Sequence, residues 1–402
     1  MARYLLSFVG SQDPYSDKTQ EAGPIATLAA QLAPLAEVIL LYTADFADKA
    51  TDTRDWLTAE NLGGNVHLWP VPDSFTHDPI DLNGAIAVAR AALTALPRDA
   101  EILLNGSSGT PTMKSAWPIL QAAGYVPNGQ VWQVRNPKEM NPDQERVFPT
   151  NLNSLRAEFE RQVLLRQIRD YNYSGALQFL PTSVFQHPTV EGWLRYGRAR
   201  LALDFVEAQR ALSALTEVPP RFQQETNALC RKEVKAIAWE GYFVAEIHYK
   251  TGQIGNFLVL LSALLETVWC AYAEEKTGLK LYKTKTSEEI WQQLQSQEAL
   301  YNYLQNQCVR CEGWLNRYHY RALVEFYEPP ATAIAQAAHR LCSHRLLDSR
   351  NDLAHKLQGK ADMTPQAAAA IFADLRVLLG EQSGPNPYEV LHREIERHLS
   401  WA

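Results

Sequence analysis

Short apolar segments alternate with amphipathic stretches over the first third of the chain. The apolar segments are bounded by glycine, proline or polar residues, which is typical of strands, and the stretches between them carry apolar residues at helical spacing. Strands that alternate with helices favour a parallel sheet of the doubly wound α/β kind. The expected strands are 4–9, 38–42, 66–69, 102–104 and 130–134, and the expected helices include 24–35 and 85–96.

From Leu152 to the end the pattern is helical. The stretch 136–150, rich in proline, asparagine and charge, is typical of a domain boundary. Stretch 256–274 is so apolar that its helix must be buried on most of its circumference, as core or as a dimer interface. The sequence therefore predicts an α/β domain followed by an all-α part. Its expected helices are 193–215, 222–250, 256–274, 331–347, 365–379 and 387–399.

Composition is that of a folded soluble protein. The chain has 402 residues, of which 46% are hydrophobic and 21% charged, and this length predicts two or three domains. Its five cysteines are scattered, and only Cys308 and Cys311 form a CxxC pair, so no disulfide framework is expected. No signal peptide and no uninterrupted run of about 18 apolar residues is evident, so we expect a cytoplasmic protein that does not enter a membrane.

Charge limits where a nucleic acid could bind. The net charge of −7 argues against a broad nucleic-acid surface, which normally belongs to a basic domain. Residues 340–360 are locally basic, and this is the place where an RNA backbone would be electrostatically favoured. RNA, if it is a substrate, must be held locally.

Two of the expected strands run into loops rich in glycine and small hydroxyl side chains. In a doubly wound sheet, ligands bind at the carboxyl ends of the strands. Glycine lets backbone amides approach a ligand closely, and hydroxyls donate hydrogen bonds to phosphate or ribose. Neither loop matches GxGxxG or a P-loop, so a conventional dinucleotide or ATP site is not expected; a turn without a ligand is the alternative interpretation. The candidate ligand-binding residues are Gly10, Ser11, Gln12, Asp13, Ser107, Ser108, Gly109, Thr110, Met113 and Lys114.

The strings Phe-Val-Gly-Ser-Gln-Asp-Pro and Asn-Gly-Ser-Ser-Gly-Thr-Pro-Thr-Met, which contain these loops, resemble the two nucleotide-facing motifs of the CARF domain. That domain is a Rossmann-like ligand-sensing fold of CRISPR-associated proteins, and the resemblance covers about residues 1–140. It implies a homodimer with a cyclic oligoadenylate lying across its two-fold axis. We expect cyclic tetra-adenylate as the activator, because one short loop pair per chain suits a compact ring. Cyclic hexa-adenylate is the alternative.

A second candidate site lies near the C-terminus. Ser349 can cap a helix, with Asp352 at the capping-box position, which places Arg350 in a first turn suited to a phosphate. Asn351 and His355 share a helix face, whereas Arg350 and His355 lie roughly 140° apart around the helix. These two residues converge only if the arginine reaches round or if a second chain supplies the facing copy. A solvated helix face is the simpler interpretation of the pattern alone.

The order Arg-Asn-x3-His resembles the Arg-x4-His motif of HEPN-type ribonucleases. The string Tyr-x-Tyr-x-Gly-Ala at 171–176 resembles a turn in the middle region of CARF–HEPN proteins. Together these resemblances imply a cyclic-oligoadenylate-activated endoribonuclease of type III CRISPR defence. Such an enzyme cleaves single-stranded RNA without a metal cofactor by 2′-OH attack, which leaves a 2′,3′-cyclic phosphate. The implied catalytic residues are Arg350, Asn351 and His355, and the implied parts are a CARF domain (1–140), a helical connector (151–250) and a HEPN domain (251–402).

Two other functions compete with this one. A CARF-containing dimeric sensor or regulator would have no nuclease activity, and Arg350 and His355 would be structural. A nucleotide-dependent enzyme on the N-terminal half would need phosphate fingerprints that its loops lack. The sequence contains no HxH or HExxH motif and predicts no metal site. It leaves open the RNA sequence preference and whether the CARF domain also degrades its activator.

Overall fold

The computed structural model describes residues 2–400, except 17–19, 98, 142, 308–309, 345–363 and 381–383. The chain divides into two compact units, Met1–Gln162 and Val163–Ser400. The first unit combines a sheet with helices, and the elements assigned in the second are all helical. This is the predicted fold class, while the expected separation of a connector from a HEPN domain near residue 250 stays a prediction.

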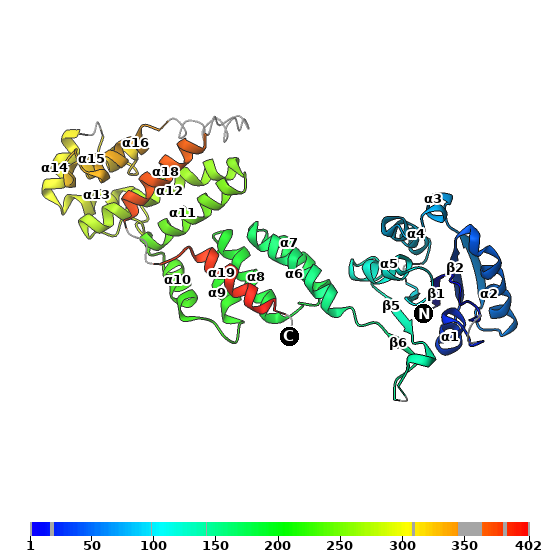
Figure 1. The fold of residues 1–402 in the computed structure, drawn as a ribbon. Coiled ribbons are helices and arrows are strands. Elements are labelled where there is room, and N and C mark those ends of the chain that lie inside the picture. The colour runs from blue at the N-terminus through cyan, green and yellow to red at the C-terminus, as the bar shows by residue number, and fades with distance from the viewer. Residues whose placement is uncertain are drawn as a thin grey trace. The chain divides into compact units, whose positions relative to one another are not determined.

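A six-stranded sheet with the order β3-β2-β1-β4-β5-β6 forms the centre of the first unit (Figure 1). β1 to β5 are parallel, and β6 runs antiparallel to β5. Each of the first five strands lies within one residue of its predicted bounds. β6 falls in the stretch predicted to be a boundary, because a three-residue strand is too short to show alternation. The strands are β1 (Arg3–Phe8), β2 (Glu37–Tyr42), β3 (Asn65–Pro70), β4 (Glu101–Asn105), β5 (Gly129–Val134) and β6 (Val147–Pro149).

Helices cover both faces of this sheet, which makes it doubly wound (Figure 1). Leu5 on β1 belongs to the core beneath α1 and α2, whereas Leu6 and Phe8 belong to the core beneath α3, α4 and α5. The alternation along β1 thus fills two cores. The helices are α1 (Pro24–Leu32), α2 (Ala47–Ala59), α3 (Asp73–His77), α4 (Leu82–Thr94) and α5 (Pro111–Ala122).

Two local effects explain where these helices depart from the expected ones. α1 ends three residues before the predicted bound, because Ala33 precedes Pro34 and takes an extended conformation with ψ of 151°. α2 was not predicted. It buries only Ala50, Thr53 and Leu57, which is too few apolar positions to show a stripe in the sequence.

The second unit is a helical assembly. α18 packs on α11, α12 and α16, and α19 packs on α8, so the last helices of the chain contact much earlier ones (Figure 1). α6 (Asn153–Arg169) contains the boundary between the units. The other helices are α7 (Tyr173–Phe179), α8 (Pro188–Leu201), α9 (Phe205–Ser213), α10 (Pro220–Cys230), α11 (Val234–Lys250), α12 (Ile254–Thr277), α13 (Ser287–Gln295), α14 (Glu298–Gln307), α15 (Arg317–Tyr327), α16 (Ala333–Cys342), α18 (Pro365–Leu379) and α19 (Pro387–His398).

Two predicted long helices are each broken into a pair. The stretch 193–215 turns between α8 and α9 at Leu203, which has φ of +59°. The stretch 222–250 turns between α10 and α11 at Lys232, with φ of +54°. A left-handed backbone conformation usually favours glycine. Neither turn contains a glycine at this position, so no signal in the sequence indicates that the helices end there.

α12 confirms the expectation of a buried helix. By length and composition it could cross a membrane, but half of its apolar window is buried inside the unit. It packs against α11, α15 and α18. All five apolar residues on which the prediction rested are buried, namely Leu258, Leu261, Leu264, Leu265 and Trp269.

One buried ion pair joins three helices of this unit. Arg200 on α8 is 3% exposed and Glu240 on α11 is 2% exposed. The guanidinium donates through Nε and Nη2 to the two carboxylate oxygens, at 2.8 and 2.7 Å. Tyr388 on α19 donates its hydroxyl to Glu240 Oε1 at 2.8 Å. Arg200 Nη1 donates to the Tyr196 hydroxyl at 2.7 Å and to Glu225 Oε2 at 2.9 Å. A buried charge pair is tolerated only when its remaining polar atoms are also satisfied, and these contacts meet that condition.

Candidate ligand-binding site at the carboxyl ends of the strands

β1 and β4 are neighbours at the centre of the sheet, and the chain leaves them toward opposite faces. α1 follows β1 on one face, and α5 follows β4 on the other. At such a switch point the two loops diverge and leave the crevice in which doubly wound proteins bind their ligands. The predicted ligand loops, 10–13 and 106–114, both begin at this edge.

The two loops approach each other backbone to backbone at their glycines. A Cβ atom on Gly10 would lie 2.8 Å from the backbone nitrogen of Gly109. Gly109 has φ of +93°, and a Cβ there would lie 2.8 Å from Sδ of Met113. Side chains at either position would therefore push the loops apart or distort them.

Asp13 fastens the loops together. Its side chain is fully buried, and Oδ2 accepts hydrogen bonds from the Gly10 amide at 3.0 Å and the Ser108 hydroxyl at 2.8 Å. Oδ1 accepts from the amide of Ile25, in the first turn of α1, at 3.0 Å. The carboxylate thus joins both loops and α1, and it is turned into the protein instead of toward a ligand.

Burial dominates the titration of this carboxyl group. Desolvation raises the pKa of Asp13 from its ordinary value of 3.8 to about 6, although the hydrogen bonds from Ile25, Gly10 and Ser108 and the charge of Lys49 act in the opposite direction. The folded protein therefore binds a proton at this position more tightly than the unfolded chain does.

Asn105, at the end of β4, was not among the predicted site residues, although it organises the second loop. It is fully buried, donates through Nδ2 to Ser7 Oγ at 2.9 Å and accepts from the Ser107 amide at 2.8 Å. Ser107 Oγ in turn accepts from the Val134 amide at 2.8 Å. The signal that could have found Asn105 is its place as the last strand residue before a glycine, where its side chain can satisfy loop amides.

The first turn of α5 closes the second loop. Thr110 caps this helix by accepting from the Met113 amide at 3.3 Å. The hydroxyls of Thr110 and Thr112 both donate to the carbonyl of Pro79, at 2.9 and 3.0 Å. Met113 is buried, 4% exposed. Thr110 and Met113 therefore position the loop through contacts within the unit.

A smaller set of the predicted residues faces outward. Ser11 and Gln12 are exposed, and Ser107 and Lys114 are half-buried. Across the described parts of the unit, no side-chain partner is found for the Lys114 ammonium. It lies in the first turn of α5, where a helix N-terminus also favours negative charge. These four side chains provide hydroxyls, an amide and a cation, which suits a ligand with ribose and phosphate groups.

The predicted catalytic residues Arg350, Asn351 and His355 lie outside the described residues, as does the expected cap Ser349. Of the locally basic stretch, Arg340 is described, and it forms a bidentate ion pair with Asp374 on α18, with Nη2 to Oδ1 at 2.6 Å and Nε to Oδ2 at 3.0 Å. Its charge is therefore largely compensated within the unit.

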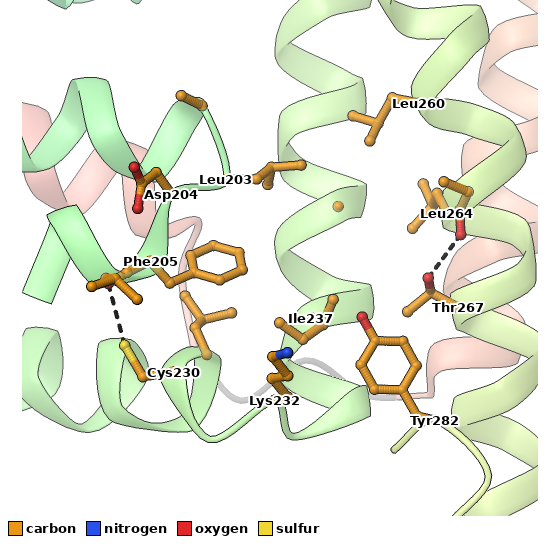
Figure 2. A pocket seen from close by; sticks show the side chains of 15 residues that line it. Leu203, Asp204, Phe205, Cys230, Lys232, Ile237, Leu260, Leu264, Thr267 and Tyr282 are labelled. Carbon is orange, nitrogen blue, oxygen red and sulfur yellow. Dashed lines mark hydrogen bonds between the residues drawn. The ribbon is translucent and has the colours of Figure 1, made fainter. Parts of the chain in front are cut away.

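The helical unit also contains a pocket of about 870 Å³ (Figure 2). The Cys230 thiol there donates to the carbonyl of Phe205 at 3.2 Å, and burial raises its pKa. Thr267 donates its hydroxyl to the carbonyl of Ala263 at 2.7 Å. Neither group is activated as a nucleophile, and the largely apolar lining is suited to hold an apolar group. Its apolar walls include Leu203, Phe205, Ile237, Leu260 and Leu264.

Comparison with known proteins identifies the fold. No family model matches the chain, and no curated protein matches it. Among solved structures the chain is similar to Enterococcus italicus Csm6 bound to cyclic hexa-2′-fluoro-hexa-dAMP. The TM-score is 0.67 at 16% sequence identity, and the match covers 99% of this chain and 100% of that one. The chain thus has the fold of that protein, an α/β unit with a mostly parallel sheet followed by a helical unit, which is the architecture expected of a Rossmann-like CARF domain followed by a HEPN domain.

Proposed function

We propose that this protein is a cytoplasmic CARF–HEPN effector of type III CRISPR antiviral defence, an endoribonuclease that a cyclic oligoadenylate activates. The observation that carries the proposal is the likeness to Csm6 over both parts of the chain, in a structure of Csm6 with a cyclic hexanucleotide analogue. The two loops with ligand-binding chemistry lie side by side at the switch point of the sheet, which supports the sensor half independently.

The activator would bind where the outward-facing groups of the two loops converge. The Lys114 ammonium, at the positive N-terminal end of α5, suits its phosphates, and the hydroxyls of Ser11 and Ser107 suit ribose or phosphate oxygens. The Gln12 amide can form hydrogen bonds with an adenine edge. In a homodimer, each chain would contribute the same loops to one ring on the two-fold axis. We retain cyclic tetra-adenylate as the expected ring and cyclic hexa-adenylate as its alternative.

RNA cleavage would follow from acid–base chemistry in the helical part. His355, with an ordinary pKa of about 6.5, would exchange a proton with the reacting oxygens, a role worth roughly 10²- to 10⁴-fold in rate. Arg350 would neutralise charge growing on the phosphorane, and Asn351 would orient the imidazole or the phosphate. The RNA 2′-OH would attack, giving a 2′,3′-cyclic phosphate and a 5′-OH. Two copies at the dimer axis would form one composite site.

Activation requires that the ring binds one arrangement of the dimer more tightly than another. A coupling free energy of about 1 to 3 kcal/mol is typical of such systems. The ring need not touch the RNA site, because binding to one arrangement of the dimer raises the population of that arrangement at both sites.

The decisive assay is cleavage of a fluorogenic single-stranded RNA in EDTA, with no ring, with cyclic tetra-adenylate and with cyclic hexa-adenylate. We expect cleavage with one ring only, products ending in 2′,3′-cyclic phosphate, and no cleavage by His355→Ala. If a ring binds but neither ring induces cleavage, the protein is a sensor or regulator without nuclease activity. If neither ring binds, the sensor assignment is wrong.

A matched pair of variants tests the ligand loops. Lys114→Gln should raise the ring concentration needed for half-maximal activation by on the order of tenfold, since a charge-assisted contact to phosphate contributes about 1.5 kcal/mol or more. The maximal rate should not change, because the RNA site is untouched. The control is Arg90→Gln, which removes an exposed cation from α4 of the same unit. Equal effects of both variants would indicate general electrostatics, not a contact.

A further inference from the structure

Two large aromatic side chains are exposed where α15 begins. Trp314, just before the helix, is 60% exposed, and Tyr318, in its first turn, is 61% exposed. Arg317 lies between them in the sequence. Single exposed apolar side chains are common, but two large exposed aromatic side chains next to an arginine on one short segment form a candidate site of interaction. We call Trp314, Arg317 and Tyr318 the aromatic–arginine surface.

The loop that carries this surface is held in place from within. Trp291 donates its indole N–H to the carbonyl of Gly313 at 2.8 Å. The amide of Asn316 donates to His319 Nδ1 at 3.2 Å, so this nitrogen is an acceptor and Nε2 carries the proton. Nε2 then donates to the carbonyl of Arg310 at 2.7 Å. Because these hydrogen bonds anchor both ends of the loop, Trp314 is displayed on a fixed support.

The surface carries positive charge. The Arg317 guanidinium lies 5.1 Å from the centre of the Tyr318 ring, and its Nη2 donates to the Tyr318 hydroxyl at 3.2 Å. Within the described part of the unit, Arg317 forms no ion pair with a carboxylate. Arg310, 79% exposed, has only a long contact of 3.9 Å with the exposed Glu312. A guanidinium held beside an aromatic ring and not neutralised by a carboxylate suits a phosphate nearby.

The end of α16 contacts the backbone of the segment that carries this surface. The thiol of Cys342, the last residue of α16, donates to the carbonyl of Arg317 at 3.5 Å. Burial raises the pKa of that thiol to about 11, and the charges of Arg321 and Arg317 act in the opposite direction, as expected for nearby cations. In the sequence, Arg350 follows Cys342 by eight positions. The surface therefore adjoins the point from which the chain continues toward the proposed catalytic residues.

We propose that the aromatic–arginine surface binds the single-stranded RNA substrate by stacking bases on Trp314 and Tyr318 while Arg317 contacts a phosphate. Stacking is tolerant of sequence because every base has a π-face. It also explains how an acidic chain, with a net charge of −7, can hold RNA without a broad basic face. The inference rests on the proposed ribonuclease function, because it supplies that enzyme with a substrate contact outside its catalytic residues.

Binding is measured separately from cleavage by using an RNA of about 15 nucleotides with 2′-O-methyl groups, which lacks the attacking hydroxyl. Fluorescence anisotropy of this RNA should show that Trp314→Ala and Tyr318→Ala each raise Kd by on the order of tenfold. Trp314→Phe should retain most of the affinity because it keeps a π-face. The control is Tyr125→Ala, which removes an aromatic ring, 56% exposed, from the N-terminal unit and should leave Kd unchanged.

Salt dependence separates stacking from charge. For the two aromatic variants, the slope of log Kd against log salt should match that of the wild type. Arg317→Gln should reduce it by roughly 0.7, the value for one phosphate contact to a single strand. In ring-activated cleavage of unmodified RNA, the aromatic variants should raise KM and leave kcat unchanged.

Unchanged Kd in both aromatic variants would overturn the inference, and ring-activated cleavage would still support the proposed function. If only these variants lose RNA affinity but no ring activates cleavage by the wild type, the surface binds RNA and the proposed ring-activated ribonuclease function is wrong. If the variants instead change the oligomeric mass measured by light scattering while Kd stays constant, the surface is a protein interface and the inference is wrong.

Discussion

Asp13→Asn tests how the ligand loops are held. In the wild type, the carboxylate accepts from the amides of Gly10 and Ile25 and from the Ser108 hydroxyl. An asparagine has one oxygen and one NH₂ group, so one backbone amide must face a donor, while the serine hydroxyl can rotate and accept. A buried N–H without an acceptor costs about 1 to 3 kcal/mol. This cost does not depend on pH, because asparagine does not titrate.

The wild type itself depends on pH. The pKa of Asp13 is raised from 3.8 to about 6 in the folded protein, so the folded state binds the proton more tightly than the unfolded state. The stabilisation is fully present below about pH 3.8 and is lost as the pH rises through 6. At about 1.4 kcal/mol per pH unit, the whole loss is about 3 kcal/mol, of which about 2 kcal/mol falls between pH 4.5 and 7. The wild type should therefore exceed Asp13→Asn most clearly at pH 4.5, and its advantage should shrink or reverse at neutral pH.

The assay is urea unfolding of the full-length chain, followed by pulsed hydrogen exchange in peptides from β1 and β4, at several pH values from 4.5 to 7.5. This readout isolates the sheet from the helical unit. Asp52→Asn serves as the control, since Asp52 is exposed on α2. A difference between wild type and Asp13→Asn that stays constant within about 0.5 kcal/mol over this range would refute the burial of an ionisable Asp13.

Three further predictions concern packing and backbone. Gly10→Ala places a Cβ 2.8 Å from the Gly109 nitrogen, so it should lower the free energy of unfolding by about 1 to 3 kcal/mol and weaken ring binding. Urea unfolding and titration calorimetry measure these two quantities, and wild-type values for both would contradict the close contact. Arg200→Met should cost about 3 to 5 kcal/mol, because it leaves the buried Glu240 carboxylate without a cation. Glu240→Leu should cost less, because Arg200 keeps its ion pair with Glu225 at 2.9 Å. The double variant should cost clearly less than the sum of the two, and additive costs in a double-mutant cycle would disprove the pairing. Lys232→Gly should raise the free energy of unfolding by about 0.5 to 1 kcal/mol because φ is +54° there, and Lys232→Ala, which keeps the Cβ, should show no comparable gain in thermal unfolding.

The sheet could be predicted because its signals are local. The apolar runs of β1 and β4 end at Gly10 and Gly106, and this pattern predicts the strand bounds to within one residue and the edge at which we propose that the activator binds. The sequence did not show that Asp13 faces inward. That orientation depends on Ile25 and Ser108, which are distant in the chain and become partners only through the topology of the sheet.

In the helical unit, the helices could be predicted from the sequence, but several turns and buried ion pairs could not. Its helices are visible from periodicity, but the break at Leu203 is not, because the left-handed residue is a leucine whose conformation the packing imposes. Buried pairs such as Arg200 and Glu240 are equally hidden, since each residue alone resembles a surface charge. Arg350 and His355 remain sequence predictions and lie outside the described residues.

The hydrogen bonds that join the ligand loops set an order of events during folding. Ser108 and Asp13 are 95 positions apart, and Asn105 and Ser7 are 98 apart. Contacts this distant in sequence form late, because much of the intervening chain must first be ordered. During synthesis the first loop is made early and has no partner until β4 has emerged and joined β1. A nascent chain with half a sheet therefore lacks the paired loops, so the activator site that we propose can exist only after β4 has joined β1.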